Sequence, residues 1–263
     1  MPLTGKVALV TGSTSGIGEA IVRRFALSGA QVLVHGQQRE DAERVAASIR
    51  ESGADADALS ADLERPEECE ALIAEAASRF GRLNVLVNNA AVITRSNLDT
   101  TDVETFDRTI AVNLRAPLLL IRAALPHFRR QGGGTVLNIG SINGYCGERT
   151  QLAYSISKGG LMTLSRNLAD AHGTENIRVN HFNLGWVLTP NEYALKIREG
   201  MPEDWPERVP ATFAPSGRLL SPEQIAHFAL AFVSDQGGPV NGAVVDLEQY
   251  PMVGRNPTKA PER

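Results

Sequence analysis

The chain has 263 residues, 43% of them hydrophobic and 21% charged, with a formal net charge of −4 at pH 7. This balance excludes a disordered or fibrous protein, and the length predicts one domain spanning residues 1–263. The 26 basic residues form no cluster, and the longest strongly apolar run, 117–121, is far shorter than the ~20 residues of a membrane span. We therefore expect no nucleic-acid partner, no membrane partner and a cytoplasmic protein.

Short apolar runs alternate with longer stretches of helical periodicity. Runs that are apolar on both faces predict parallel strands, and the alternation predicts a Rossmann-like, doubly wound α/β fold, a three-layer sandwich with helices on both faces of the sheet. We expect strands at 6–11, 31–35, 56–60, 85–87, 135–139, 178–182 and 244–247. We expect helices at 17–28, 39–52, 66–80, 103–114, 117–130, 152–172 and 222–234.

Two further segments do not fit this alternation. The Pro-rich segment 189–215 is too long for an ordinary connection, so we expect it to form a functional lid. The tail, 251–263, contains several prolines and is expected to be irregular. The cysteines Cys69 and Cys146 and the five histidines are scattered without ligand spacing, which predicts free thiols and no metal site.

A glycine-rich segment follows the first expected strand. Gly12, Gly16 and Gly18 have the spacing G-x-x-x-G-x-G and precede the first expected helix. Glycines in this context let the backbone approach a pyrophosphate, whose charge the helix N-terminus favours. The spacing alone also fits a structural turn, but the strand–turn–helix context favours a dinucleotide site.

Five ordered motifs resemble the short-chain dehydrogenase/reductase family in its standard-length form, and the match runs from residue 6 to residue 247. They are the glycine segment, Asn88-Asn89-Ala90-Ala91 where the family has Asn-Asn-Ala-Gly, then Asn113, Ser141, and Tyr154-Ser155-Ile156-Ser157-Lys158. One loop departs from the family pattern, because Leu184 replaces a proline while Gly185 is kept. The resemblance implies an enzyme that acts on CH–OH groups.

The resemblance also implies a catalytic set of Asn113, Ser141, Tyr154 and Lys158. Tyr154 and Lys158 are four residues apart and therefore lie on one face of the expected helix. Tyr154 would be the general acid/base, and Lys158 would bind the nicotinamide ribose and lower the tyrosine pKa from its usual value near ~10. Ser141 would bond the reacting oxygen, and Asn113 would hold a water that relays protons to Lys158.

The implied cofactor is NAD or NADP. Family members that prefer NAD carry an acid after the second strand, whereas this chain has Gly36-Gln37-Gln38-Arg39 there, which favours NADP slightly. Arg39 equally fits a solvated residue in the first turn of a helix. The residues expected to bind the cofactor are Gly12, Ser13, Ser15, Gly16, Ile17, Gly18, Gly36, Arg39, Asp62, Leu63, Asn89, Ala90, Tyr154, Lys158, Val187 and Thr189.

The expected substrate is a small polar molecule. Asn143, Arg149 and Gln151 lie near Ser141 or Tyr154 in sequence, and Trp186 follows Gly185, which together favour a sugar or polyol. The alternatives are a reductase of 3-oxoacyl thioesters on acyl carrier protein and, in another class, a non-catalytic nucleotide-binding sensor. The family resemblance also implies a homotetramer paired through the helices at 103–130 and 152–172.

Overall fold

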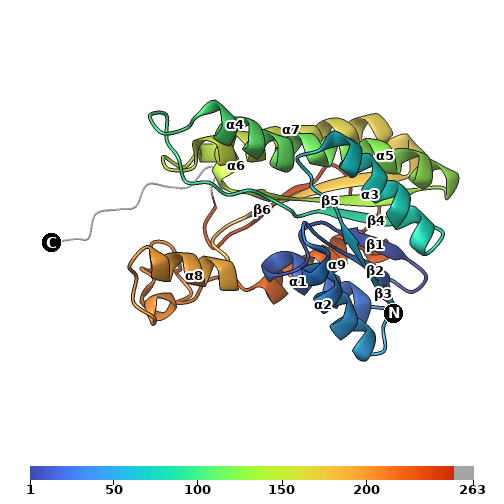
Figure 1. The fold of residues 1–263 in the computed structure, drawn as a ribbon, viewed down its shortest axis with the longest axis horizontal. Helices are drawn as coiled ribbons and strands as arrows, with labels where there is room; N and C mark the ends of the chain where they lie inside the picture. The colour runs from blue at the N-terminus through green and yellow to red at the C-terminus, as the bar shows by residue number, and fades with distance from the viewer. Residues whose placement is uncertain (252–263) are drawn as a thin grey trace.

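Seven parallel strands form the central sheet, in the order β3-β2-β1-β4-β5-β6-β7 (Figure 1). The computed structural model describes residues 1–251. The strands are β1 (Val7–Val10), β2 (Gln31–Gly36), β3 (Ala56–Ser60), β4 (Val85–Asn88), β5 (Gly134–Ser141), β6 (Ile177–Leu184) and β7 (Val244–Leu247). The strand order reverses between β1 and β4, which is where open parallel sheets place their ligands, outside the carboxyl ends of the strands.

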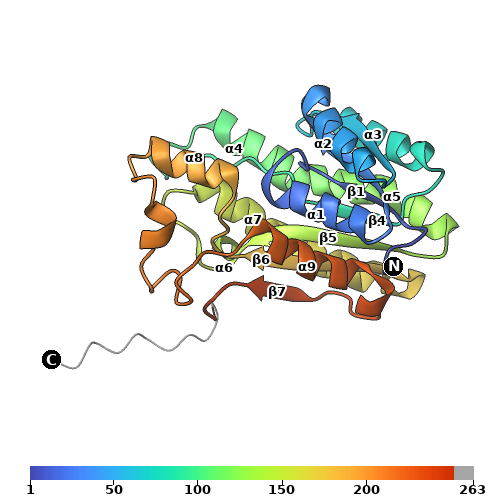
Figure 2. The same ribbon diagram turned by 90° about the horizontal axis from the view of Figure 1, so that it is seen from below.

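Helices cover both faces of the sheet (Figures 1 and 2). One face carries α1 (Gly16–Leu27), α2 (Arg39–Glu51) and α9 (Pro222–Val233), and the other carries α3 (Pro66–Arg79), α4 (Val103–Ile110), α5 (Ala116–Arg130) and α7 (Leu152–His172). Alternate residues of each strand enter two separate apolar cores, one on each face. The predicted Rossmann-like fold class is confirmed.

The predicted elements exist, but some of their boundaries differ. The helices expected at 103–114 and 117–130 form one helical run, because residues Ala111–Arg115 make a π-helical turn that joins α4 to α5. Strands β5 and β6 extend beyond their apolar runs, to Ser141 and Leu184, because the two strands stay paired over that length. Two short helices were not predicted, namely α6 (Asn143–Cys146) and α8 (Pro190–Arg198).

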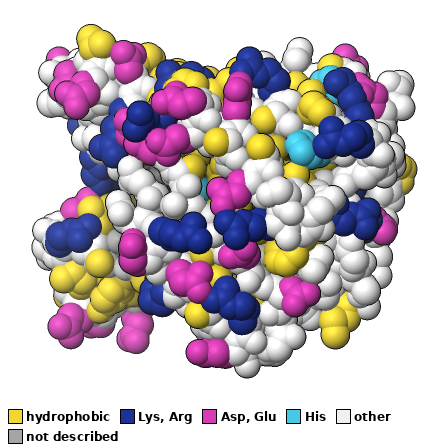
Figure 3. Space-filling view, turned by 45° about the vertical axis from the view of Figure 1, so that its right-hand side comes forward, with side chains coloured by type: hydrophobic (Ala, Val, Ile, Leu, Met, Phe, Trp, Pro, Cys, Tyr) yellow, Lys and Arg dark blue, Asp and Glu magenta, His cyan; other side chains and the backbone are white. Residues whose placement is uncertain are grey.

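The helical run at 103–130 is long and apolar enough, by length and composition alone, to cross a membrane. Here it packs within the fold: α5 contacts α3, and α4 contacts α7. Leu119 is buried in the core beneath α5, and Leu161 is buried on α7, whereas Leu118 is 42% exposed. On the face seen in Figure 3, Lys and Arg side chains are interspersed with Asp and Glu.

The expected lid, 189–215, contains α8 and a single helical turn at Trp205–Arg208. It has a small apolar core of its own, in which Trp205, Ala214 and Leu219 are buried. The ion pair between Arg95 and Glu199, 2.7 Å long, joins the lid to the loop that follows β4. Most of the tail predicted to be irregular, residues 252–263, lies outside the described residues.

Candidate active site

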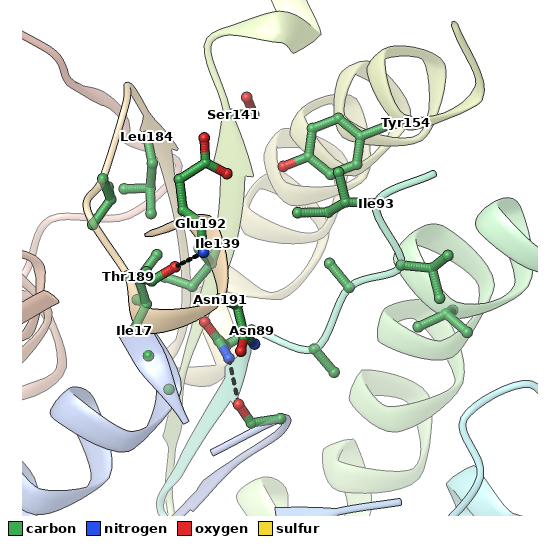
Figure 4. Close-up of a pocket in the computed structure, with 18 of the residues that line it drawn as sticks. Ile17, Asn89, Ile93, Ile139, Ser141, Tyr154, Leu184, Thr189, Asn191 and Glu192 are labelled. Atoms are coloured by element: carbon green, nitrogen blue, oxygen red, sulfur yellow. Dashed lines mark hydrogen bonds between the residues drawn. The ribbon is translucent and has the colours of Figure 1, made fainter. Parts of the chain in front are cut away.

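A cavity of about 1210 Å³ opens beyond the carboxyl ends of the strands. The glycine segment after β1, the end of β2, the segments after β3 and β4, the end of β5 and the start of α7 all contribute to its walls. The lid helix α8 contributes a further wall. Ser141, Tyr154 and Ile93 face this space from three different elements (Figure 4).

The glycine segment forms a cradle in which side chains do not fit. A Cβ atom on Gly12, whose φ is +60°, would lie 2.8 Å from Ala90 Cα, and one on Gly18 would lie 2.3 Å from the Gly12 carbonyl oxygen. Helix α1 starts at Gly16 and directs its free N–H groups toward the cavity that Gly16, Ile17 and Gly18 line. These residues therefore fit the pyrophosphate of a dinucleotide.

His35 anchors the glycine cradle to the segment after β3, a role that was not predicted from the sequence. Its Nδ1 accepts a hydrogen bond of 3.1 Å from the Gly12 N–H, so the proton is on Nε2, which donates to the Ala61 carbonyl over 3.2 Å. Its backbone exchanges hydrogen bonds with Ser13. Burial lowers the pKa of His35 to about 4, which keeps the ring neutral.

The predicted acid/base residues are brought together at the start of α7. The Tyr154 hydroxyl is directed toward Ser141 at the end of β5, and Tyr154 lies at the start of α7 (Figure 4). The Lys158 ammonium donates to the Ile139 carbonyl over 2.7 Å and lies 5.5 Å from the centre of the Tyr154 ring. All three residues line the cavity, with their side chains almost fully buried.

The buried position of Tyr154 affects its pKa. Burial raises it to about 12, and the Ser141 hydroxyl opposes that shift only in part. Burial also lowers the pKa of Lys158 to about 8. Burial is thus the largest influence on the Tyr154 hydroxyl, and the expected lowering of its pKa by Lys158 stays a prediction. The tyrosine is therefore protonated at neutral pH.

Asn113 lies at the centre of the π-helical turn, away from the cavity wall. Its side chain accepts from the Val92 N–H over 2.8 Å and donates to the Val92 carbonyl over 2.9 Å. It also donates to Ser157 Oγ over 3.1 Å, so it ties the loop after β4 to α7. The structure thus gives Asn113 an anchoring position, and its water-relay role stays a prediction.

Most of the other predicted residues do line the cavity. These are Gly12, Ser15, Gly16, Ile17, Gly18, Gly36, Asp62, Leu63, Asn89, Ala90, Asn143, Gln151, Trp186, Val187 and Thr189. Three predicted residues do not line it. Ser13 is buried and donates to the Val10 carbonyl, Arg39 is exposed at the start of α2, and Arg149 is exposed beside Glu148.

Several residues on the cavity wall were not predicted. They include Ile93, Arg95, Glu192, Lys196, Arg198 and Phe213. Most belong to α8 and its neighbourhood, whose place over the cavity depends on the tertiary fold rather than on a local pattern. Among residues 1–251, no group of three His, Cys, Asp or Glu side chains could hold a metal ion.

The family model for short chain dehydrogenases matches residues 6–199. The chain is a short-chain dehydrogenase/reductase. A relative of this family, the cis-4-hydroxycyclohexanecarboxylate dehydrogenase of Sinomonas cyclohexanicum, is 35% identical over 247 residues, which are 92% of this chain and 95% of that protein.

Two solved structures of similar proteins contain nicotinamide cofactors. L-sorbose reductase from Gluconobacter frateurii, complexed with NADPH and L-sorbose, has a TM-score of 0.88 and 30% identity over 94% of this chain and 97% of that one. The 3-ketoacyl-(acyl-carrier-protein) reductase from Brucella melitensis, complexed with NADH, has a TM-score of 0.81 and 32% identity over 93% and 97%. This short-chain dehydrogenase/reductase is therefore an oxidoreductase, and its neighbours support an NAD(P) cofactor.

Proposed function

We propose that this protein transfers a hydride between NAD(P) and the secondary alcohol or carbonyl carbon of a small polar substrate, a sugar or a polyol. The observation that supports the proposal most directly is that Ser141 and Tyr154 face each other across the cavity that the glycine cradle also lines. A non-catalytic nucleotide sensor would not need this pair beside the cradle.

The nicotinamide, when bound, supplies or accepts the hydride. Ser141 holds the substrate oxygen, and Tyr154 gives that oxygen a proton in reduction or takes one from it in oxidation. A protonated tyrosine with a pKa of about 12 is ready to act as the acid at neutral pH. Lys158, fixed on the Ile139 carbonyl, stabilises the phenolate when it forms and can bond the ribose of the cofactor.

The polar wall near Ser141 supports a hydroxyl-rich substrate. Asn143 Nδ2 donates to Gln151 Oε1 over 2.9 Å, so each amide keeps one polar group for a ligand. Sites built from such groups reject ligands that leave them unpaired. By its name, the L-sorbose reductase of similar fold acts on a sugar.

The second candidate is a 3-oxoacyl thioester reductase. Ile93 and Phe213 line the cavity and are 58% and 60% exposed, so an apolar acyl chain would find contacts at the rim. By its name, one neighbour of similar fold is a reductase of 3-ketoacyl groups on acyl carrier protein.

A screen of the purified protein tests both candidates. NAD(H) and NADP(H) are each combined with sugars, polyols and acetoacetyl thioesters, and the absorbance of the reduced cofactor is followed. We expect turnover of a sugar or polyol, with a slight preference for NADP(H), because residues 36–39 at the end of β2 include no acid to repel a 2′-phosphate. Reduction of thioesters alone would establish the second candidate instead.

We further propose a cytoplasmic homotetramer that pairs the faces of α5 and α7. Leu118 and Ile156 are 42% and 47% exposed on these helices, which fits a contact between subunits. Light scattering at micromolar concentration should give four times the monomer mass, and a monomer would contradict the proposal.

A further inference from the structure

Trp186 was expected to be near the substrate, but the contacts of its ring are with the lid. The indole stacks on Trp205 with ring centres 5.6 Å apart, and Phe213 meets it edge-on at 6.1 Å. The Lys196 ammonium lies 5.7 Å from its centre. The indole N–H donates to Glu192 Oε1 over 2.9 Å. Trp186 is therefore placed to orient Glu192 rather than to stack on a ligand.

Glu192 is held at both its backbone and its side chain. Its backbone N–H donates to Thr189 Oγ1, which caps α8, and its Oε1 accepts from Trp186. Within residues 1–251, its second oxygen, Oε2, has no hydrogen-bond donor. Figure 4 shows the carboxylate directed into the cavity on the side of Ser141 and Tyr154. A half-buried, fixed acceptor with an unused oxygen thus lies beside the reacting groups.

A second carboxylate adds to this wall. Glu148 Oε2 accepts from the Thr150 N–H and from Thr150 Oγ1, which leaves Oε1 free of partners among the described residues. Asn143 Oδ1 is likewise unused, because Asn143 bonds Gln151 through Nδ2. The wall therefore presents three oxygen acceptors and, at Gln151 Nε2, one donor. Hydroxyl groups supply the donors that such a wall needs.

Five Lys and Arg side chains line the cavity. Arg108 pairs with Glu64, and Lys158 lies behind Tyr154, bonded to the Ile139 carbonyl. Arg95 and Lys196 both bond the carboxylate of Glu199, over 2.7 and 2.8 Å, and Glu199 itself lies off the cavity wall. Arg198 is exposed and has no ion-pair partner within residues 1–251. On the wall beside Ser141, the unused acceptors include one carboxylate oxygen each of Glu192 and Glu148, whose charge repels an anionic substrate.

We propose that Glu192 binds substrate hydroxyl groups and selects neutral polyols or sugars over hydroxy acids, with Trp186 as its positioning residue. The inference rests on the proposed hydride transfer to a small polar substrate. A bound substrate without these hydroxyls leaves the oxygens of Glu192 and Glu148 unpaired, which lowers its affinity. A substrate carboxylate meets the same oxygens with like charge.

Steady-state oxidation of D-sorbitol, gluconate and 2-butanol tests the inference. Sorbitol and gluconate differ at one end by a hydroxyl against a carboxylate, and 2-butanol lacks the additional hydroxyls. We expect the wild-type kcat/KM for sorbitol to exceed that for either of the others by about tenfold or more. Glu192→Gln should lower it by about 10- to 100-fold, the range for hydrogen bonds to charged groups. The same variant should raise the ratio of kcat/KM for gluconate to kcat/KM for sorbitol.

The control is Glu207→Gln, which makes the same chemical change on an exposed lid carboxylate outside the cavity. Cofactor Kd, from quenching of protein fluorescence, should be the same in wild type and both variants. Trp186→Phe keeps an aromatic ring but removes the N–H that orients Glu192. It should therefore raise the gluconate-to-sorbitol ratio of kcat/KM by less than Glu192→Gln does.

The possible failures are distinguishable. A wild-type preference for gluconate that disappears in Arg198→Gln overturns the role of Glu192 but leaves the proposed hydride transfer intact. If Glu192→Gln leaves the gluconate-to-sorbitol ratio of kcat/KM unchanged, the role of Glu192 is likewise overturned and the proposed hydride transfer stands. Reduction of acetoacetyl-CoA without turnover of any of the three alcohols overturns both the inference and the proposed substrate class.

Discussion

In the proposed mechanism, the Tyr154 hydroxyl exchanges a proton with the substrate oxygen beside Ser141. Tyr154→Phe keeps the ring in its buried place and removes only that hydroxyl. We expect kcat to fall by about 10²- to 10⁴-fold, the usual contribution of a positioned acid or base. Cofactor Kd and thermal stability should stay close to wild type. Activity above a few per cent of wild type would contradict the acid/base role.

His35 sets the position of the glycine cradle relative to the segment after β3. His35→Phe leaves the Gly12 N–H and the Ala61 carbonyl without their partners, so the cradle loses its anchor. We expect the Kd of NADPH, measured by fluorescence titration, to rise about tenfold, since a lost hydrogen bond costs about 1 kcal/mol or more.

The accompanying kcat at saturating cofactor should stay within about twofold of wild type, because the chemistry lies elsewhere. His35→Gln offers an amide oxygen that can accept from Gly12, and it should recover part of the affinity. An unchanged Kd in His35→Phe would show that the cradle keeps its shape without this anchor.

The residues that the sequence could place are those whose neighbours are local or in a fixed motif. Tyr154 and Lys158 share a helix face, and Ser141 ends a strand, so their meeting follows from the fold class. Glu192 gave no such signal, because its contact with Trp186 depends on how the lid folds over the cavity. Arg149 was expected near the substrate, but the turn after α6 directs it to solvent.

At the scale of elements, the lid is organised around Trp205. This residue is fully buried and stacks between Trp186 and Tyr193, in a cluster separate from the two cores of the sheet. Trp205→Ala removes most of that cluster, a change that costs about 3–5 kcal/mol in a well-packed core. We expect a KM about tenfold higher and faster hydrogen exchange across 186–219.

The main thermal transition should change little, since the sheet cores do not contact this side chain. Phe228→Ala is a matched control, because Phe228 is an aromatic residue on α9 that is 48% exposed and lies outside the lid. A large fall in the main transition of Trp205→Ala, or an unchanged KM, would show that the lid is not a separate unit.

Strands and long helices were predictable because their periodicity records burial on one face or two. The π-helical turn at Ala111–Arg115 was not, because Pro117 is typical of the start of a new helix and so predicted a break at this place. Helix α8 was hidden by prolines, although its Pro190 is at the first helical position, where proline is favoured.

At the scale of the whole molecule, two fully buried histidines make stability depend on pH. His181 lies on the α7 side of β6, where Nε2 bonds Asn183 Oδ1 over 2.9 Å and Nδ1 bonds Ser165 Oγ over 3.1 Å. Asn183 Nδ2 donates to Asp246, so Asn183 Oδ1 accepts and Nε2 of His181 carries a proton. Burial lowers the pKa of His181 to about 4, as it does for His35.

Both histidines are neutral in the folded protein down to about pH 4, whereas in the unfolded chain they take up protons below pH ~6.5. The unfolded state therefore binds more protons between these limits, so the contribution of the two histidines to the free energy of unfolding is constant above pH ~6.5 and falls as the pH is lowered toward 4. Each histidine contributes about 3 kcal/mol to that fall.

Urea unfolding between pH 4.5 and 7.5 measures the slope of the free energy of unfolding against pH. His181→Gln should reduce it, whereas His227→Gln, at an exposed site on α9, should not. An unchanged slope in His181→Gln would show that His181 is not the source of the acid sensitivity.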